Sequence, residues 1–271
     1  MSWLQCILYG LIMGISEFIP VSSSAQSRIL LQLFGASGSD PLRSLVVHIG
    51  AIVAFIIIWR MPLDRFLPNT VPGRGNSRNF RRPVVDAETR FIKAAILPML
   101  GVMLLSLFVS NTTSSLMFVM LLIVNGIMLY LPGRMLQGNK GARAMSSIDA
   151  WLIGAAGALS IIPGLSRIGL QISVAQICGA DRKHALNWGY ALSVPALLLL
   201  ICIDFVSLLF GGASIAFSTG IFGYLLLAVF SFTGSALATY FTRNFIIHRG
   251  LSTYAYYSWG SALFVFILYL L

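Results

Sequence analysis

Charged residues are scarce in this sequence, and acidic residues are the scarcest of them. Asp and Glu number 8 against 18 Lys and Arg, so charged residues make up 10% of the 271 positions, whereas a soluble domain has about a quarter. The three cysteines, Cys6, Cys178 and Cys202, lack the close spacing of a metal site and lie in apolar runs, which favours buried thiols. The composition therefore excludes an ordinary soluble domain and gives no basis for a disulfide.

Hydrophobic residues fill most of the remaining positions. They make up 58% of the sequence, and the mean hydropathy is +0.88. Residues 3–19 do not resemble a cleaved signal peptide, because they lack a basic start and Glu17 interrupts them. The long apolar runs show no strand-type alternation, which predicts an all-α polytopic membrane protein with six spanning helices, at 44–60, 91–109, 115–132, 185–210, 217–241 and 252–271.

Positive charge collects in a few of the connections between these runs. The basic segments are 61–90, 133–146, 181–184 and 243–250, whereas 109–116 and 210–218 carry no charge. Basic loops of a membrane protein face the cytoplasm, and the alternation of these segments with the six runs is consistent with that rule. Because the rule accounts for the net charge of +10, we expect no nucleic-acid partner. The segment 61–90 is predicted to be a basic cytoplasmic loop within a single membrane domain, 1–271.

Two hydrophobic stretches, 3–35 and 149–179, are broken in the middle by Pro, Gly, Ser and a charge. Irregular backbone at membrane depth is tolerated only where protein or a water-filled cavity surrounds it. Each stretch is therefore predicted to be a re-entrant helical hairpin, the first entering from outside and the second from the cytoplasm.

The two predicted hairpins also resemble each other. GISEFIPVSSSAQ (14–26) and GALSIIPGLSRIGLQ (157–171) share a glycine, a polar residue, Ile-Pro, a serine and a following polar group. Two similar halves of opposite orientation form an inverted repeat, in which broken helices meet near the midplane and line a site. We expect that arrangement here.

Glu17 and Arg167 occupy matching places in the two breaks. An ionisable group in a membrane costs about 2.5–3.5 kcal/mol or more, which makes both residues functional candidates. The planar guanidinium of arginine suits a phosphate, and serine hydroxyls and helix N-termini add further anion ligands. A phosphate cradle is one interpretation; a buried ion pair that only ties the hairpins together is the other.

Three further polar residues lie within the apolar segments. His48 is either a hydrogen-bonding contact between helices or a proton-transfer group near neutral pH. Arg28 either faces a cavity or extends its side chain to the membrane surface, and the second is favoured. Asp204 has no role in this scheme.

The motifs SEFIPVSSSAQ and PGLSRIG resemble the two signatures of the bacterial undecaprenyl-diphosphate phosphatase family. The segments HIGAIVAF, ILPMLGV and ALSVPALLL fit the same pattern, so the resemblance covers nearly the whole chain. It implies an enzyme of the bacterial cytoplasmic (inner) membrane that removes the terminal phosphate of undecaprenyl diphosphate, so recycling the lipid carrier for cell-wall synthesis. It also implies six spans with two re-entrant hairpins and a divalent cation, Mg or Ca.

Site roles follow from the matched motif positions. The resemblance implies catalytic roles for Glu17, Ser23 and Arg167, with Glu17 as a metal ligand. The predicted substrate-binding residues are Ser22, Ser24, Gln26, Gly164, Ser166 and Gly169.

The sequence departs from the family pattern at several of these positions. The first glutamate of the family falls at Met13, and the histidine that closes its first motif falls at Gln26. Ile168 and Gln171 replace hydroxyl residues of the second motif, and 187–189 read Asn-Trp-Gly instead of Glu-Phe-Ser. His48 stands where the family has glutamine. We hypothesise that the role of the imidazole has moved from position 26 to position 48, which adds His48 to the catalytic set.

These departures leave two functions open. The first is the phosphatase, because phosphoryl transfer depends mainly on positioning and charge neutralisation. The alternative is a transporter or flippase that binds a polyprenyl phosphate without cleaving it. In both cases the expected partners are a polyprenyl (di)phosphate lipid and the bilayer, and no particular oligomeric state is indicated.

Overall fold

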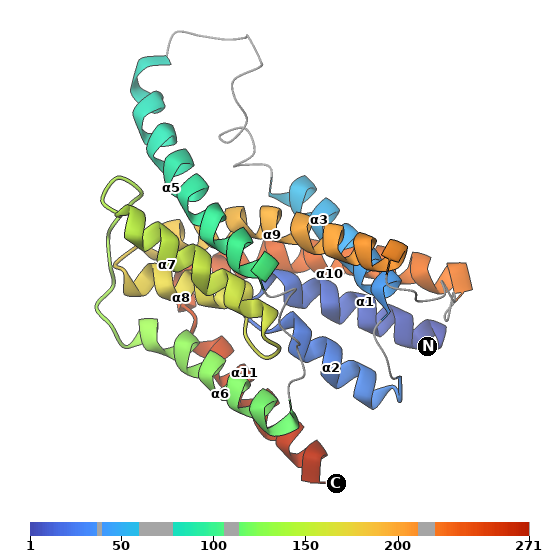
Figure 1. The fold of residues 1–271 in the computed structure, drawn as a ribbon. Coiled ribbons are helices and arrows are strands. Elements are labelled where there is room, and N and C mark those ends of the chain that lie inside the picture. The colour runs from blue at the N-terminus through green and yellow to red at the C-terminus, as the bar shows by residue number, and fades with distance from the viewer. Residues whose placement is uncertain (37–39, 60–77, 106–113, 211–219, 271) are drawn as a thin grey trace.

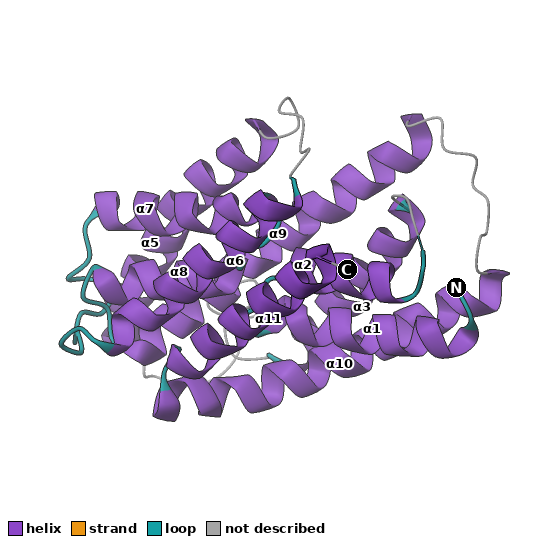
Figure 2. Cartoon of the chain, turned by 90° about the horizontal axis from the view of Figure 1, so that it is seen from below, coloured by secondary structure: helices purple, strands orange, loops and turns teal. Residues whose placement is uncertain are grey.

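The chain is helical throughout the residues that the structure, a computed structural model, describes: 1–36, 40–59, 78–105, 114–210 and 220–270 (Figures 1 and 2). No β-strand occurs in these ranges, where one isolated bridge joins Lys140 and Ala180. The prediction of an all-helical protein is confirmed. The helices are α1 (Trp3–Phe18), α2 (Ser23–Leu33), α3 (Pro41–Ile58), α5 (Arg78–Leu105), α6 (Ser115–Tyr130), α7 (Ser147–Ala158), α8 (Arg167–Ile177), α9 (Arg182–Phe210), α10 (Gly220–Arg249) and α11 (Ser252–Leu270), with 3₁₀ turns η2 (Leu131–Gly133) and η3 (Leu159–Ile161).

Polar caps define where several of these helices begin. The first amides of a helix have no partner within it, and a Ser or Asp side chain satisfies one of them. Asp40 caps α3, with Pro41 at the first helical position. Serine side chains cap five other helices in the same way, at Ser2, Ser22, Ser114, Ser146 and Ser166. Such caps matter most in a membrane, where water cannot supply the missing hydrogen bond.

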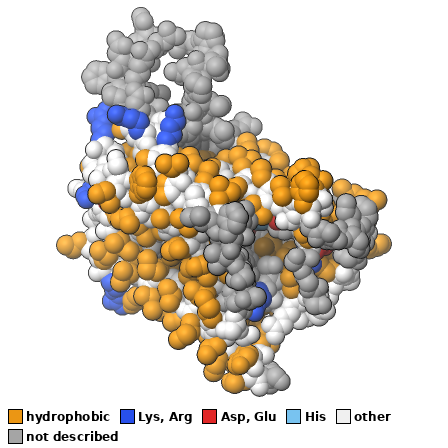
Figure 3. All heavy atoms as spheres, viewed as in Figure 1, with side chains coloured by type: hydrophobic (Ala, Val, Ile, Leu, Met, Phe, Trp, Pro, Cys, Tyr) orange, Lys and Arg blue, Asp and Glu red, His pale blue; other side chains and the backbone are white. Residues whose placement is uncertain are grey.

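Four helices of the described chain are long and apolar enough to cross a membrane: Pro41–Ile58, Ser115–Gly133, Arg182–Phe210 and Gly220–Arg249. Their outer faces carry large exposed apolar side chains, for example Phe205 and Phe210 on α9 and Ile221 on α10. The molecular face in Figure 3 is mostly apolar, with Lys and Arg side chains gathered mainly at its upper left edge. A soluble protein does not expose so much contiguous apolar surface, so this is a membrane protein.

The helices pack in a few extended pairs. α1 lies along α10, which α3 also contacts, and α5 packs on α7, α6 on α11 and α3 on α9 (Figure 1). Two glycines permit close backbone approach in these pairs: a Cβ on Gly14 would collide with the Ser231 carbonyl, and one on Gly154 with the Ala95 carbonyl. Small residues at such crossings let helices pack closely in lipid.

Each predicted hairpin consists of two helices separated by a short break. Residues 19–22 separate α1 from α2, and residues 162–166 separate η3 from α8. The predicted loops fit less well. Helix α5 begins at Arg78, so the second part of the predicted loop 61–90 is helical, while 61–77 lies outside the described residues. Helix α10 likewise continues through the predicted loop 243–250 to Arg249. A helix satisfies its own backbone, so basic residues do not stop it where it leaves the apolar region.

Candidate active site

The two helix breaks meet in the interior. The amide of Gly164 donates a 3.4 Å hydrogen bond to Ser24 Oγ, and the hydroxyls of Ser24 and Ser22 lie 3.0 Å apart. Gly164 has a φ of 109°, a backbone conformation that favours glycine. The tip of one broken pair is thus joined to the tip of the other, although the two lie 140 positions apart in the sequence.

A cavity of about 790 Å³ lies beside this junction. Residues of the second break, of η3 and of α1, α2, α3, α5, α8 and α9 line it. Its polar and charged lining residues are Tyr9, Glu17, Ser23, Ser24, Ser27, Arg28, Asp40, Arg43, Ser44, His48, Ser160, Arg167, Asp204 and Ser207. Its walls also include apolar side chains, among them Met13, Leu31, Met103, Leu200 and Ile203.

Glu17 and Arg167 form a buried ion pair at the inner end of this set. Arg167 Nη2 donates to Glu17 Oε2 at 2.7 Å, with the residues 9% and 4% exposed respectively. Glu17 also accepts a hydrogen bond from the Ser23 hydroxyl. Arg167 Nε is buried, and no hydrogen-bond partner for it lies among the described residues. The guanidinium therefore ties the hairpins together and still has a donor left for an anionic oxygen.

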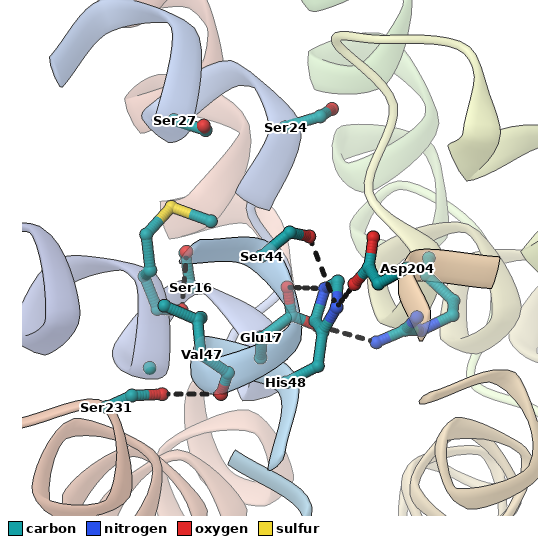
Figure 4. A network of polar contacts seen from close by, with 12 residues as sticks. Ser16, Glu17, Ser24, Ser27, Ser44, Val47, His48, Asp204 and Ser231 are labelled. Atoms are coloured by element: carbon teal, nitrogen blue, oxygen red, sulfur yellow. Dashed lines mark hydrogen bonds and ion pairs between the residues drawn. The ribbon is translucent and has the colours of Figure 1, made fainter. Parts of the chain in front are cut away.

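His48 lies between two carboxylates (Figure 4). Its Nδ1 is 2.8 Å from Asp204 Oδ2 and 3.5 Å from Ser44 Oγ, and its Nε2 is 3.9 Å from Glu17 Oε1. Helix α3 supplies the imidazole and α9 supplies Asp204, because these two helices pack together. The resulting row is Asp204, His48, Glu17 and Arg167.

The sequence alone assigns no role to Asp204. It lies near the middle of a predicted span, and this location is the signal in the sequence, because an acidic group deep in an apolar helix needs a partner or a function. The partner, His48, is 156 positions away, and nothing in the spacing of the sequence brings the two together.

The predicted substrate-binding residues separate into two groups. Ser24 lines the cavity, together with Ser23 of the predicted catalytic set. Ser22 does not; its hydroxyl accepts from the Ala25 amide as the cap of α2. Gly164, Ser166 and Gly169 also lie off the cavity wall, and their amides donate hydrogen bonds within the protein. The Ser166 amide donates to Asn125 Oδ1 at 2.8 Å, and the Gly169 amide donates to Ser166 Oγ at 3.1 Å. Serine and glycine in this motif shape the break and start α8, so that Arg167 reaches the cavity.

Gln26 is directed elsewhere. It is buried, and its Oε1 accepts a 3.0 Å hydrogen bond from Tyr257 on α11. It is not among the residues that line the cavity. The hypothesised exchange between positions 26 and 48 is therefore not a swap across one cavity, because only His48 lies there.

Two more arginines line the same cavity. The Arg28 guanidinium lies 4.8 Å from the centre of the Phe118 ring, and that of Arg43 lies 5.4 Å from the centre of the Tyr9 ring. The sequence favours an Arg28 side chain that extends to the membrane surface, whereas the structure places it on the cavity wall. With Arg167, the wall thus holds three arginines beside the carboxylates of Glu17, Asp40 and Asp204. The arginines can bind an anionic head group, and the apolar side chains of the wall suit an apolar chain.

The described residues do not fit a divalent-cation site made by protein alone. No group of three or more His, Cys, Asp or Glu side chains among them is arranged to hold a metal. Glu17 is already paired with Arg167, and Met13, on the cavity wall one turn earlier, supplies no oxygen. Mg²⁺ and Ca²⁺ bind about six or more oxygens.

The fold and the site define a helical membrane protein with a buried acid–base network where two broken helices meet. A family model described as "Bacitracin resistance protein BacA" matches residues 6–264. The undecaprenyl-diphosphatase of Carboxydothermus hydrogenoformans is 32% identical over 263 residues, covering 96% of this chain and 94% of that protein. The undecaprenyl-diphosphatase of Thermodesulfovibrio yellowstonii is 30% identical over 268 residues, covering 98% and 96%. The chain belongs to the BacA family, which confirms the resemblance found in its motifs.

Proposed function

We propose that this protein is an undecaprenyl-diphosphate phosphatase of the bacterial cytoplasmic membrane. The observation that carries the proposal is Arg167, a buried arginine on the cavity wall whose Nε has no hydrogen-bond partner among the described residues. The names of the relatives and the match along nearly the whole chain support the same reaction. The product would be the lipid monophosphate that cell-wall synthesis uses again.

The cavity has the features that such a substrate needs. The Arg167 guanidinium would donate to a phosphate oxygen, and Ser24 would add a hydroxyl donor from the N-terminus of α2. The apolar side chains of Met103, Leu200 and Ile203 would contact the first prenyl units. Head group and tail would thus both find chemically matching walls.

The reaction is a hydrolysis of the phosphoanhydride. A water oxygen bonds to the terminal phosphorus, the bridging P–O bond breaks, and the bridging oxygen leaves on the prenyl monophosphate. Arg167 neutralises charge on the phosphoryl oxygens, which is the main requirement of phosphoryl transfer. Glu17, held by Arg167 and Ser23, orients the water. A divalent cation remains a prediction of the family resemblance, and no step here passes through it.

We also propose the finer topology: six spanning helices plus two re-entrant hairpins, α1–α2 and α7–α8, in an inverted repeat. The packing supports it. In this repeat α1 corresponds to α7, α3 to α9, α5 to α10 and α6 to α11. Exchange of each helix with its counterpart turns the α1–α10 pair into α7–α5, and it leaves the α3–α9 and α6–α11 pairs unchanged. All of these pairs occur. Determination of which loops face the cytoplasm, by labelling single introduced cysteines from each side, tests this arrangement.

The transporter alternative finds no support in the comparisons, since the relatives are named for hydrolysis. Phosphate release from undecaprenyl diphosphate by purified protein tests the proposed function. We expect release by the wild type, a loss of at least about a hundredfold in Arg167→Ala, and full activity in the control Arg134→Gln, whose arginine is exposed on a loop. A wild type that binds the lipid without releasing phosphate would contradict the proposal.

A further inference from the structure

Asp204 and His48 form a contact that the family resemblance does not explain. The family motifs assign no role to position 204, and His48 stands where the family has glutamine. Yet the two side chains approach to 2.8 Å on the wall of the cavity, with side-chain exposures of 17% and 12%. A carboxylate on one ring nitrogen of a histidine fixes the ring orientation and the tautomer, as in many catalytic sites.

We propose that Asp204 is a positioning residue that holds His48 in the Nδ1–H tautomer, so that His48 Nε2 serves as the hydrogen-bond acceptor for the attacking water. The inference rests on the proposed phosphatase function and adds two residues to it. Asp204 accepts the Nδ1–H, because a carboxylate can only accept. The lone pair of Nε2 then faces the cavity.

The distance between His48 Nε2 and Glu17 Oε1 supports this role. At 3.9 Å it is too long for a direct hydrogen bond. For a water oxygen about 2.8 Å from each of these two atoms, the angle between them at that oxygen would be near 90°. One water can therefore donate to both acceptors. That water would lie beside Arg167, since Glu17 Oε2 is bound to it at 2.7 Å.

The proposed hydrolysis forms one bond, breaks one bond and transfers one proton to His48. The water oxygen bonds to the terminal phosphorus while the bridging P–O bond breaks and its electron pair leaves on the prenyl monophosphate. One water proton passes to His48 Nε2 and gives an imidazolium that the Asp204 carboxylate stabilises. The other remains on the released inorganic phosphate, and the imidazolium returns its proton to solvent or product.

The competing explanation is structural: the pair only holds α3 against α9. The two explanations differ in what Asp204→Asn does. An asparagine keeps the size and can donate to Nδ1, which places the ring proton on Nε2 and removes the acceptor. Positioning therefore predicts a lower kcat with KM within about threefold, whereas a structural role predicts loss of folded protein or a change in both constants.

We expect Asp204→Asn to lower kcat by about 10²-fold, His48→Ala to lower it at least as much, and Asp204→Glu to recover part of the loss. Cys202→Ala, an exposed position on the same helix, is the matched control and keeps wild-type kinetics. In the His48→Ala background, Asp204→Asn has no further effect, because Asp204 acts through His48.

The tautomer is measured directly, and independently of activity, by ¹⁵N NMR of histidine-labelled protein, which has three histidines. We expect an Nδ1–H tautomer for His48 in the wild type and an Nε2–H tautomer in Asp204→Asn. A doubly protonated or Nε2–H ring in the wild type overturns the inference. It is also overturned if Asp204→Asn lowers kcat in the His48→Ala background as much as it does in the wild type. A wild type that shows the Nδ1–H tautomer but releases no phosphate refutes the proposed function instead, and with it the catalytic use of this pair.

Discussion

Arg167 donates a 2.7 Å hydrogen bond to Glu17, a residue 150 positions earlier in the chain. The contact joins the end of α1 to the start of α8, and both side chains are buried. The pair therefore has two functions. It holds the two broken helices together, and it places both charged groups on the wall of the cavity.

Removal of one partner of this pair should destabilise the fold. Glu17→Leu and Arg167→Met each leave one buried charge, which costs about 3–5 kcal/mol, whereas the double variant leaves none. We expect both single variants to melt well below the wild type in detergent and the double variant to regain most of the loss. Additive effects of the two substitutions would contradict the proposed coupling.

The two glycine crossings should be equally sensitive to an added methyl group. The added methyl group would push against the Ser231 carbonyl in Gly14→Ala and against the Ala95 carbonyl in Gly154→Ala, which costs about 1–3 kcal/mol of stability in each variant. Gly101→Ala is the control, because a Cβ there meets no atom of the described residues within 4 Å. Thermal melting measures all three, and an unchanged melting temperature in Gly14→Ala would count against the α1–α10 packing.

Position 26 should not substitute for position 48. Gln26 is hydrogen-bonded to Tyr257 and lies off the cavity wall. We therefore expect Gln26→His to leave the activity of His48→Ala unrestored, as measured by phosphate release. Recovery in the double variant would show that a ring at 26 reaches the substrate.

A carboxylate at position 13 should create a cation site that the wild type does not form from protein alone. Met13 lines the cavity one helical turn before Glu17. We expect Met13→Glu to show a larger Ca²⁺-dependent rise in melting temperature than the wild type, because it adds oxygen ligands. Met117→Glu, exposed on α6, controls for added charge.

The stability of the start of α9 should depend on pH through Asp181, which lies immediately before that helix. Partial burial raises the pKa of the Asp181 carboxyl, but hydrogen bonds from the Lys183 amide and the His184 ring outweigh it and hold that pKa below its ordinary value. A lowered pKa means that the carboxylate stabilises the fold above its unfolded pKa of about 3.9, and that this contribution is lost as pH falls through the folded value.

Asp181→Ala should therefore cost about 1 kcal/mol of stability near neutral pH. We expect the difference in melting temperature from the wild type to shrink in acid. Asp181→Asn retains a capping side chain without a titrating charge and is the control. A difference that stays constant down to pH 3 would contradict this role.

Local patterns sufficed to predict the helices, the two breaks and the buried positions of the charged residues Glu17 and Arg167. Apolar runs and an Ile-Pro break are visible within a few residues, and a buried charge stands out in any apolar segment. The sequence did not show that the Gly169 amide bonds to Ser166 and the Ser166 amide to Asn125, because a serine at a break suits a helix cap and an anion site equally well. Nor did it join Asp204 to His48, since only the packing of α3 on α9 brings them together.

The most direct test of the account is the initial rate of phosphate release from undecaprenyl diphosphate by purified protein, compared between the wild type and Arg167→Ala. We expect release by the wild type and at least about a hundredfold less by the variant, with Arg134→Gln unaffected. Equal rates in the wild type and Arg167→Ala would contradict it.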